Sequence, residues 1–351
     1  MKKLKILIAN DGYHAHYFER MSWLNAFNSI NFIEAQIYDT KTPAFRIFDE
    51  FQPDIFIGQL YNLDKATIKC IKNRPHLKVA LRAGDWSDFH TDPRFNILQT
   101  TQKEIKLLED LKNETGQPEF IYIHYEQESV NQTHSHFVNK LNIPAVGILL
   151  CADIHSYLNP EYDPALECDI GFVGGYWPYK GQIINKYLLP LCYPVNKYKI
   201  KIFGNQGWTG VNQYCGHIKE EKVKNLFRSA RICPNLSEPH AHEYGIEVNE
   251  RSFKVLAAGG FCVGDNVASH KRIFKDGMVF ADNEQDFQDH VNYYLNNYDE
   301  AEKIAKQGQK IVLSEHTNYH RIAQFLNRFG YEKESSSILS LWNKYYAENF
   351  N

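Results

Sequence analysis

The sequence predicts an α/β protein with two domains, each built on a mostly parallel sheet. At 351 residues the chain is longer than one hydrophobic core usually serves. In both halves, short apolar runs typical of strands alternate with stretches typical of helices, which is the pattern of parallel strands joined by right-handed crossovers. The segment 153–168 has two prolines and little periodicity. We therefore expect a first domain at 1–152, a linker at 153–168, a second domain at 169–330, and a closing helix in 331–351 that packs back toward the first domain.

The first half contains strand-like and helix-like runs in alternation. Strands are expected at 5–9, 32–38, 55–58, 77–82, 120–124 and 145–150, and helices at 17–27, 65–73 and 103–112. Ligands of such sheets bind beyond the carboxyl ends of the strands. Asp85 follows the fourth strand and His124 ends the fifth, so both are candidates for acid/base work, because His titrates near neutrality and burial raises the pKa of Asp. Taken singly, each is more often a loop or capping residue.

The second half repeats the alternation. Its expected strands lie at 169–173, 198–203, 231–234 and 261–263, and its expected helices at 179–191, 220–230, 249–258, 286–297, 300–314, 320–328 and 336–346. The helix that begins near residue 249 carries Arg251 in its first turns and ends at Gly259 and Gly260. A helix N-terminus with an adjacent arginine is suited to a phosphate or diphosphate. The alternative is a surface unit whose charges are only solvated.

A glycine turn between strand and helix supplies a second cation. The stretch GGYWPYKG begins with Gly174 and Gly175 and places Lys180 at the start of the following helix. It is neither a Walker A loop nor G-x-G-x-x-G, but its backbone N–H groups and ammonium suit phosphate charge. Lys180 and Arg251 would both lie at the carboxyl edge of one sheet. Two such cations are what a nucleotide-sugar donor requires, because its leaving group gains negative charge.

Composition and spacing argue against several other classes. The net charge of -3 gives no general field for nucleic acid or an anionic membrane, so nucleic acid is not an expected partner. Seven scattered cysteines without a C-x-x-C spacing indicate reduced thiols and a cytoplasmic protein. The apolar run at residues 6–9 is shorter than a signal peptide requires, and no run is long enough to span a membrane, which leaves peripheral membrane association open. We expect no metal, because His240 and His242 lack cysteine support.

Four stretches of the second half carry a family resemblance: DIGFVGGYWPYKG, YCGHIKEEKVKNLFRSARICPN, EVNERSFKVLAAGGFCV and KIAKQGQKIVLSEHTNYHRIAQFL. Together they span about residues 169 to 325 and resemble glycosyltransferases of the GT-B fold, in particular the spore-maturation-protein (CgeB)-like group related to family 1 glycosyltransferases. The resemblance implies two Rossmann-like domains facing across a cleft. The first would bind an acceptor and the second a nucleotide-diphosphate sugar. The first half matches only as a generic Rossmann-like domain.

The resemblance also implies roles for matching residues. Glycines and a lysine would lie against the donor phosphates, the loop at 216–218 would approach the base, and the helix at 249 would hold the diphosphate or sugar. These residues are Gly174, Gly175, Lys180, Gly216, His217, Ile218, Asn249 and Arg251. Glu243 is the nearest match to the first of two glutamates that the family carries around this helix. Lys254 occupies the place of the second, which usually binds ribose, so the nucleotide (UDP, GDP or dTDP) stays open.

The leading hypothesis is a metal-independent glycosyltransferase that needs no cofactor beyond its nucleotide-diphosphate sugar donor. The acceptor would be a glycan, a protein or a small molecule. His124 or Asp85 would be the base of an inverting reaction, and Glu243 would position the sugar in a retaining one. Lys254 favours an alternative, a catalytically silent sugar- or nucleotide-binding protein on the same fold. An epimerase or phosphorylase acting on sugars is a third hypothesis, and the oligomeric state stays open.

Overall fold

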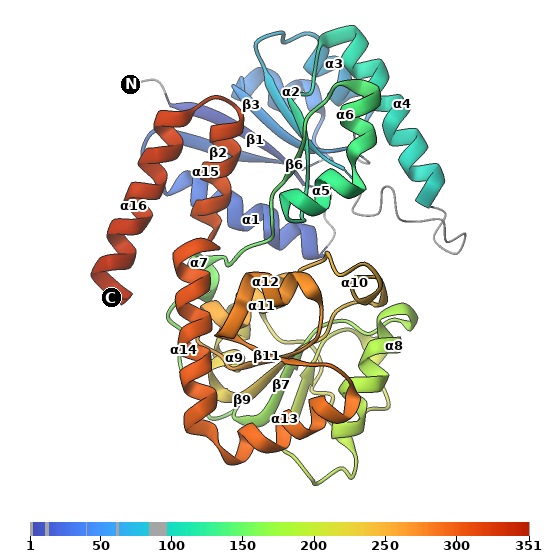
Figure 1. Ribbon diagram of the computed structural model, residues 1–351. Helices are drawn as coiled ribbons and strands as arrows, with labels where there is room; N and C mark the ends of the chain where they lie inside the picture. The colour runs from blue at the N-terminus through green and yellow to red at the C-terminus, as the bar shows by residue number, and fades with distance from the viewer. Residues whose placement is uncertain (1–2, 11–13, 40, 61–62, 84–96, 351) are drawn as a thin grey trace. The chain divides into compact units, whose positions relative to one another are not determined.

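A computed structural model describes residues 3–10, 14–39, 41–60, 63–83 and 97–350. The chain divides into two compact units. The first comprises Met1–Leu149 and Asn318–Trp342, and the second comprises Leu150–Thr317 and Asn343–Asn351. Each unit contains one parallel sheet with helices on both faces (Figure 1). The prediction of an α/β chain with two Rossmann-like domains is therefore confirmed.

The first unit is built on a six-stranded sheet with the order β2-β1-β3-β4-β5-β6. All of its neighbouring strands pair in parallel, and the central ones are buried on both faces because helices cover both. The strand order reverses at β1, which lies between β2 and β3. The strands are β1 (Leu4–Asn10), β2 (Ile33–Asp39), β3 (Ile55–Gln59), β4 (Lys78–Arg82), β5 (Phe120–Ile123) and β6 (Ala145–Gly147).

Helices α1 and α15 pack together on one face of this sheet, where Trp23 and Phe325 meet edge to face at 4.9 Å. On the other face α2 contacts α3, α3 contacts α4, and α4 contacts α6. The helices are α1 (His14–Asn28), α2 (Ala44–Phe51), α3 (Lys65–Lys72), α4 (Ile97–Thr115), α5 (Gln127–Thr133), α6 (Ser135–Leu141), α15 (Asn318–Arg328) and α16 (Glu332–Phe350), whose residues from Asn343 on are assigned to the second unit.

The second unit is built on a five-stranded parallel sheet with the order β11-β10-β9-β7-β8. The chain runs from β7 to β8 on one side and then returns past β7 to β9, so the strand order reverses between β7 and β9. In open α/β sheets ligands bind outside the carboxyl ends of the strands at such a switch point. The strands are β7 (Cys168–Val173), β8 (Ile200–Phe203), β9 (Ala230–Asn235), β10 (Cys262–Asp265) and β11 (Val279–Ala281).

Helices α8 and α13 cover one face of the second sheet, and α9 and α11 cover the other (Figure 1). A buried cluster that includes Phe172, Trp208, Phe261 and Val263 fills the space around the sheet. The helices are α7 (Ile154–Tyr157), α8 (Pro178–Tyr187), α9 (Glu220–Ser229), α10 (Pro239–Tyr244), α11 (Glu250–Ala257), α12 (Ala268–Phe274), α13 (Glu284–Asn296) and α14 (Tyr298–Glu315), with short 3-10 turns at Leu189–Cys192, Gln206–Trp208 and Lys275–Gly277.

The observed elements include several that were not predicted, among them α5, α6, α10, α12 and β11. Helix α2 was not predicted, although its buried Phe48 and Phe51 lie on one face. Residues 153–168 contain helix α7, whose N-cap Asp153 accepts a hydrogen bond from the backbone of His155, and they belong to the second unit. Residues 318–330, expected in the second domain, belong to the first unit, because α15 buries Ile322 in the core of that unit.

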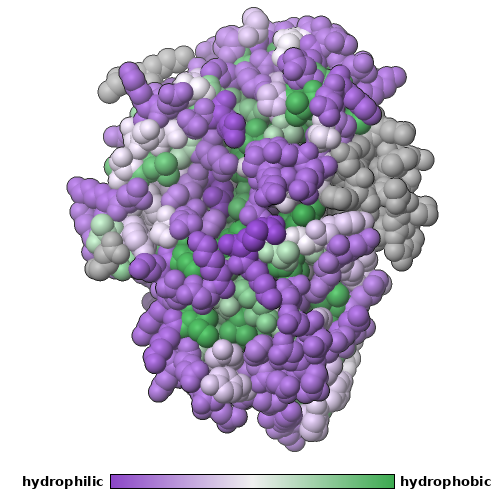
Figure 2. Space-filling model, in the orientation of Figure 1, coloured by the Kyte–Doolittle hydropathy of each residue, from purple (hydrophilic) through white to green (hydrophobic). Residues whose placement is uncertain are grey.

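The described helices include none that is both long enough and apolar enough to cross a membrane. Hydrophilic residues cover most of the coloured surface on the face drawn in Figure 2, with smaller apolar areas between them.

Candidate functional site

The side chain of Arg251 lies at the switch point of the second sheet. Its Nε donates a hydrogen bond to the carbonyl of Val173, the last residue of β7, at 2.8 Å. Its Nη1 donates to the carbonyl of Leu236, just after β9, at 3.4 Å. Arg251 comes from the first turn of α11, whose N-terminus brings unpaired N–H groups to the same corner. A single guanidinium therefore spans the two strand ends between which the strand order reverses.

Gly174 makes room for that guanidinium. A Cβ atom at position 174 would lie 2.6 Å from Nη2 of Arg251, closer than real Cβ contacts allow. On its other side the guanidinium carbon lies 4.6 Å from the centre of the Phe172 ring. The Arg251 side chain is half-buried, and burial lowers its pKa to about 10, which still leaves it charged at neutral pH.

The loop that follows β7 is held against the end of β8. The carbonyl of Gly174 accepts a hydrogen bond from the indole of Trp208 at 2.7 Å, and Asn205 bonds both the N–H and the carbonyl of Tyr176. Gly204 lies directly beneath this loop, because a Cβ there would be 2.1 Å from the carbonyl oxygen of Gly174. Gly175 belongs to the same loop and is half-buried.

Lys180 lies in the first turn of α8 and is only 8% exposed. Its Nζ is 5.0 Å from the centre of the Trp177 ring. Burial, followed by the nearby charge of Arg251, lowers the pKa of Lys180 to about 8. The structure therefore brings together the two cations that the sequence analysis singled out. A buried lysine next to an arginine is costly to keep charged, and an anion between them would remove that cost.

Acidic side chains lie near Lys180 from the loop after β9, from the loop between α10 and α11, and from the end of β10. Glu238, Glu247 and Asp265 all raise the pKa of Lys180 by their charge. Burial raises the pKa of Glu238, and Lys180 opposes that shift. The sequence analysis missed Glu238. The available signal was a carboxylate four residues after the predicted strand at 231–234 of the same sheet.

Asp265 and Glu247 each hold a histidine of α10. Asp265, fully buried at the end of β10, accepts hydrogen bonds from the N–H and hydroxyl of Ser237 at 2.8 and 2.9 Å, and its Oδ2 lies 2.7 Å from Nε2 of His242. Glu247 pairs with Nε2 of His240. The histidines considered as metal ligands are thus bound to carboxylates, and the described residues contain no group of three or more His, Cys, Asp or Glu side chains arranged to hold a metal ion.

Two buried polar side chains near this corner have no hydrogen-bond partner among the described residues. Both amide atoms of Asn235, the fully buried last residue of β9, are unpaired, and so is the hydroxyl of Ser252, which follows Arg251. Buried polar groups are rarely left unpaired, and exceptions indicate a missing water, ion or ligand group. Asn249, the N-cap of α11, donates to the carbonyl of Leu236 at 3.5 Å, and its side-chain oxygen is also unpaired.

Lys254 is part of an ion-pair cluster. Its Nζ is 2.9 Å from Glu250 and 3.7 Å from Glu220, and it lies 5.1 Å from the centre of the Tyr157 ring. Tyr157 in turn donates a hydrogen bond to Glu220. The neighbouring glutamates raise the pKa of Lys254 above its usual value and outweigh the opposing effect of burial. The cation in the place of the expected glutamate is therefore neutralised by two carboxylates from α9 and α11.

The remaining predicted residues lie in different surroundings. The loop with Gly216, His217 and Ile218 precedes α9, and the carbonyl of Gly216 accepts a hydrogen bond from the N–H of Gly204 at 3.0 Å. His217 is exposed. Glu243 is exposed on α10 and lines a cavity between α10 and α8. Asp85 lies outside the described residues.

His124 is buried in the first unit and both of its ring nitrogens are engaged. Nδ1 lies 2.8 Å from the carbonyl oxygen of Ile148, and Nε2 lies 2.8 Å from Oε1 of Glu19, which is also buried. The ring packs at 6.2 Å against Trp23. This arrangement is that of a buried histidine in close contact with a buried carboxylate, and the role of His124 as a base stays a prediction.

Comparisons with known proteins agree with this architecture. Residues 189–327 match the model of a family described as glycosyl transferase-like. No curated protein matches the chain. The matched segment includes the loop at 216–218, α10 and α11, but not the turn that carries Lys180.

Solved structures with the same fold cover nearly the whole chain. A sucrose-phosphate synthase from Thermosynechococcus elongatus is 9% identical, with 99% of this chain and 100% of that chain covered and a TM-score of 0.61. An alpha-glucosyltransferase in complex with UDP-glucose and DNA is 10% identical, with 93% and 98% covered and a TM-score of 0.60. A UDP-N-acetylglucosamine 2-epimerase is 8% identical, with 95% and 98% covered and a TM-score of 0.52. The fold is that of the GT-B glycosyltransferases with two Rossmann-like domains.

Proposed function

We propose that this protein is a glycosyltransferase that takes a sugar from a nucleotide-diphosphate donor bound to its second unit. One observation carries the proposal: Arg251 spans the ends of β7 and β9 at the switch point, with the buried Lys180 beside it. Two cations from the first turns of two helices, α8 and α11, with nearby buried polar groups that lack partners among the described residues, suit a diphosphate. The match to a glycosyl transferase-like family supports the assignment.

The two cations would act on the leaving group. In the transfer, the bond between the sugar C1 and the diphosphate oxygen breaks, a bond forms between C1 and an acceptor oxygen, and the acceptor hydroxyl gives its proton to a base. Negative charge grows on the diphosphate as the first bond breaks. Preorganised donors such as Arg251 and Lys180 stabilise that charge, a contribution typically of about 3 kcal/mol for one donor. This chemistry requires no metal in our proposal.

The other site roles stay part of the proposal. The carboxylate of Glu238, which lies near Lys180, would accept hydrogen bonds from sugar hydroxyls. Glu243 remains a candidate for positioning the sugar. His124 or Asp85 would be the base of an inverting reaction. Gly174, Gly175 and Asn249 would contact the phosphates, and the loop at 216–218 would contact the base.

UDP is the first donor nucleotide to test, because the similar alpha-glucosyltransferase was solved with UDP-glucose. GDP and dTDP sugars follow. The acceptor would be a glycan, a protein or a small molecule. In that same structure the enzyme is in complex with DNA, whereas the net charge of -3 here argues against nucleic acid as the acceptor.

The experiment compares Arg251→Lys with a matched control, Arg231→Lys. Arg231 also donates to a backbone carbonyl, that of Leu295, and lies 4.7 Å from the Tyr298 ring, but it is near the amino end of β9 and not at the carboxyl end. Donor hydrolysis and UDP binding should fall at least tenfold in Arg251→Lys, because a lysine cannot replace the forked contact, and should be unchanged in Arg231→Lys. Equal behaviour of the two variants would contradict the proposed phosphate site.

A catalytically silent binding protein is the second candidate. The observation that favours it is Lys254, which is held by Glu250 and Glu220 in the place where the resemblance leads us to expect a ribose-binding glutamate. Thermal-shift measurements with UDP, GDP and dTDP sugars, followed by a hydrolysis assay, separate the two candidates. Stabilisation without turnover of any of these donors would favour the silent protein.

A further inference from the structure

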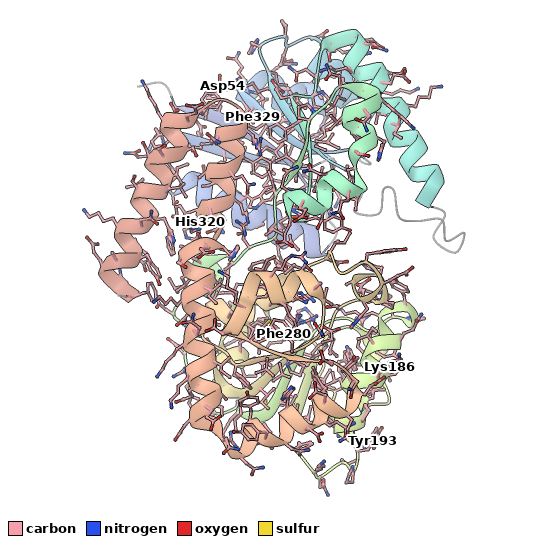
Figure 3. All side chains as sticks on the ribbon, viewed as in Figure 1. Asp54, Lys186, Tyr193, Phe280, His320 and Phe329 are labelled. Atoms are coloured by element: carbon pink, nitrogen blue, oxygen red, sulfur yellow. The ribbon has the colours of Figure 1, made fainter. Side chains whose placement is uncertain are left out.

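A cavity of about 420 Å³ lies between α8 and α10, apart from the corner with Arg251 and Lys180. Its lining consists of Gln182, Ile183, Lys186, Tyr187, Pro239, His242 and Glu243. The α8 residues share one face of that helix, since they are one, three and four positions apart. Lys186, labelled in Figure 3, lies on this helix, and its side chain is 59% exposed. The volume is within the range of small-molecule sites.

His242 is fixed in this cavity by a buried carboxylate. Asp265 accepts from Ser237 twice and lies 2.7 Å from Nε2 of His242, so Nε2 carries the proton that points to Asp265. The imidazole is also stacked on Tyr187, with ring centres 6.4 Å apart and planes within 14°. Nδ1 is the ring nitrogen left for a ligand, and 26% of the side chain is exposed. A surface histidine held from below by a fully buried aspartate is a preorganised hydrogen-bonding group.

The chemistry of the lining indicates the class of ligand. One lysine and one glutamate give no excess of either charge, which does not suit a phosphate or a polyamine. Ile183, Pro239 and Tyr187 provide apolar walls, whereas Gln182 supplies an amide that both donates and accepts. A purely apolar ligand would leave these polar groups without partners. A neutral polyol with apolar C–H faces, which is a carbohydrate, matches both sets of contacts.

We propose that the cavity between α8 and α10 is a carbohydrate-binding site, in which His242 bonds a sugar hydroxyl through Nδ1 and Lys186 and Glu243 bond others. The site is separate from the proposed diphosphate site, because neither Arg251 nor Lys180 lines it. It would hold a saccharide in the absence of any nucleotide. It shares Glu243 with the role proposed above for positioning the donor sugar, but saccharide binding without nucleotide does not depend on the proposed glycosyl transfer.

The test is titration of the full chain, without nucleotide, with glucose, N-acetylglucosamine, maltose and lactose in the millimolar range. Binding is followed by calorimetry and by the NMR signal of the His242 ring. Glu243→Gln and Lys186→Met change exposed side chains, and His242→Phe keeps a ring over Tyr187 but removes Nδ1. We expect each variant to weaken saccharide binding about tenfold, as loss of one ligand hydrogen bond does. The control is His290→Phe, which alters another histidine paired with an aspartate, Asp286 at 3.3 Å, that does not line the cavity.

Each outcome decides the matter. Saccharide binding that shifts the His242 signal, weakens in the cavity variants and persists in His290→Phe and Arg251→Lys supports the proposal. Failure of all four saccharides to bind overturns it, as does binding that Glu243→Gln and Lys186→Met leave unchanged. A loss of UDP binding in Arg251→Lys with saccharide binding intact bears only on the diphosphate site, so the two proposals fail independently.

Discussion

Replacing Lys180 with methionine should make the protein more stable and at the same time weaken nucleotide binding. Holding this lysine charged at pH 7, when its pKa has been lowered from 10.5 to about 8, costs roughly 3 kcal/mol. Methionine removes that cost and fills a similar volume. Loss of the contact between Lys180 and the Trp177 ring reduces this gain in stability by about 1 kcal/mol. We therefore expect the free energy of unfolding of Lys180→Met to exceed that of the wild type by about 2 kcal/mol at pH 7.

The pH dependence has a definite sign. The unfolded chain binds a proton at Lys180 more tightly than the folded chain does. The contribution of this lysine therefore makes the free energy of unfolding of the wild type rise as pH increases from about 8 to 10.5. The advantage of Lys180→Met should shrink over the same interval. UDP binding to the wild type should weaken above pH 8, by about tenfold for each pH unit, because the bound diphosphate requires the charged amine. Lys180→Arg, which stays charged, should flatten that dependence.

Urea unfolding followed by circular dichroism, and calorimetry with UDP, measure the two effects between pH 6.5 and 9.5. Lys186→Met is the control, because Lys186 lies on the same helix with its side chain 59% exposed. It should change neither quantity. If Lys180→Met unfolds at a lower urea concentration than the wild type, or binds UDP with unchanged affinity, the assignment of Lys180 as a strained anion-binding residue is wrong.

Three further predictions concern Gly174, His124 and Lys254. Gly174→Ala places a Cβ 2.6 Å from Nη2 of Arg251 and should weaken UDP binding at least tenfold in calorimetry; an unchanged affinity would show that the guanidinium is not needed there. His124→Phe removes one contact of the buried carboxylate of Glu19, which keeps Arg20 at 3.7 Å, and should lower the free energy of urea unfolding by about 1 kcal/mol. A large loss of transfer rate with no loss of stability would instead favour the role of a base. Lys254→Met removes the cation that pairs with Glu220 and Glu250 and should destabilise the protein by about 2 kcal/mol at pH 7. This value is lower than for a fully buried ion pair because Glu220 is partly exposed. An unchanged free energy of unfolding would contradict the structural role of Lys254.

The sequence was sufficient to predict the α/β architecture and the two cations. The strands are short apolar runs with clear helical stretches between them, so their alternation is visible without knowledge of which strands pair. Lys180 and Arg251 were found because each lies beside a local signal, a glycine turn in one case and a helix start in the other. Such signals come from a few neighbouring residues. Their proximity to each other depends on β7 and β9 being neighbours, which the strand order of the second sheet shows.

Long-range partners were beyond prediction. Asp265 holds His242 from 23 positions along the chain, and Glu220 reaches Lys254 from another helix. Whether a charge is solvated or buried follows from these pairings, so neither the low pKa of Lys180 nor the enclosed position of His124 was visible in the sequence. Helix α15 has an apolar face that would suit either core, and only its packing against α1 assigns it to the first unit.

The tight packing beneath the loop after β7 limits how this protein can be redesigned. A Cβ at Gly204 would lie 2.1 Å from the carbonyl oxygen of Gly174, and a Cβ at Gly174 would lie 2.6 Å from the guanidinium of Arg251. A mutant library aimed at new donors should therefore leave Gly174 and Gly204 unchanged and vary the loop after β9, where the side chain of Glu238 lies near Lys180. Selection would then change side chains in the loop with Glu238 without disturbing the packing of Gly174 and Gly204, next to which we expect the diphosphate to bind.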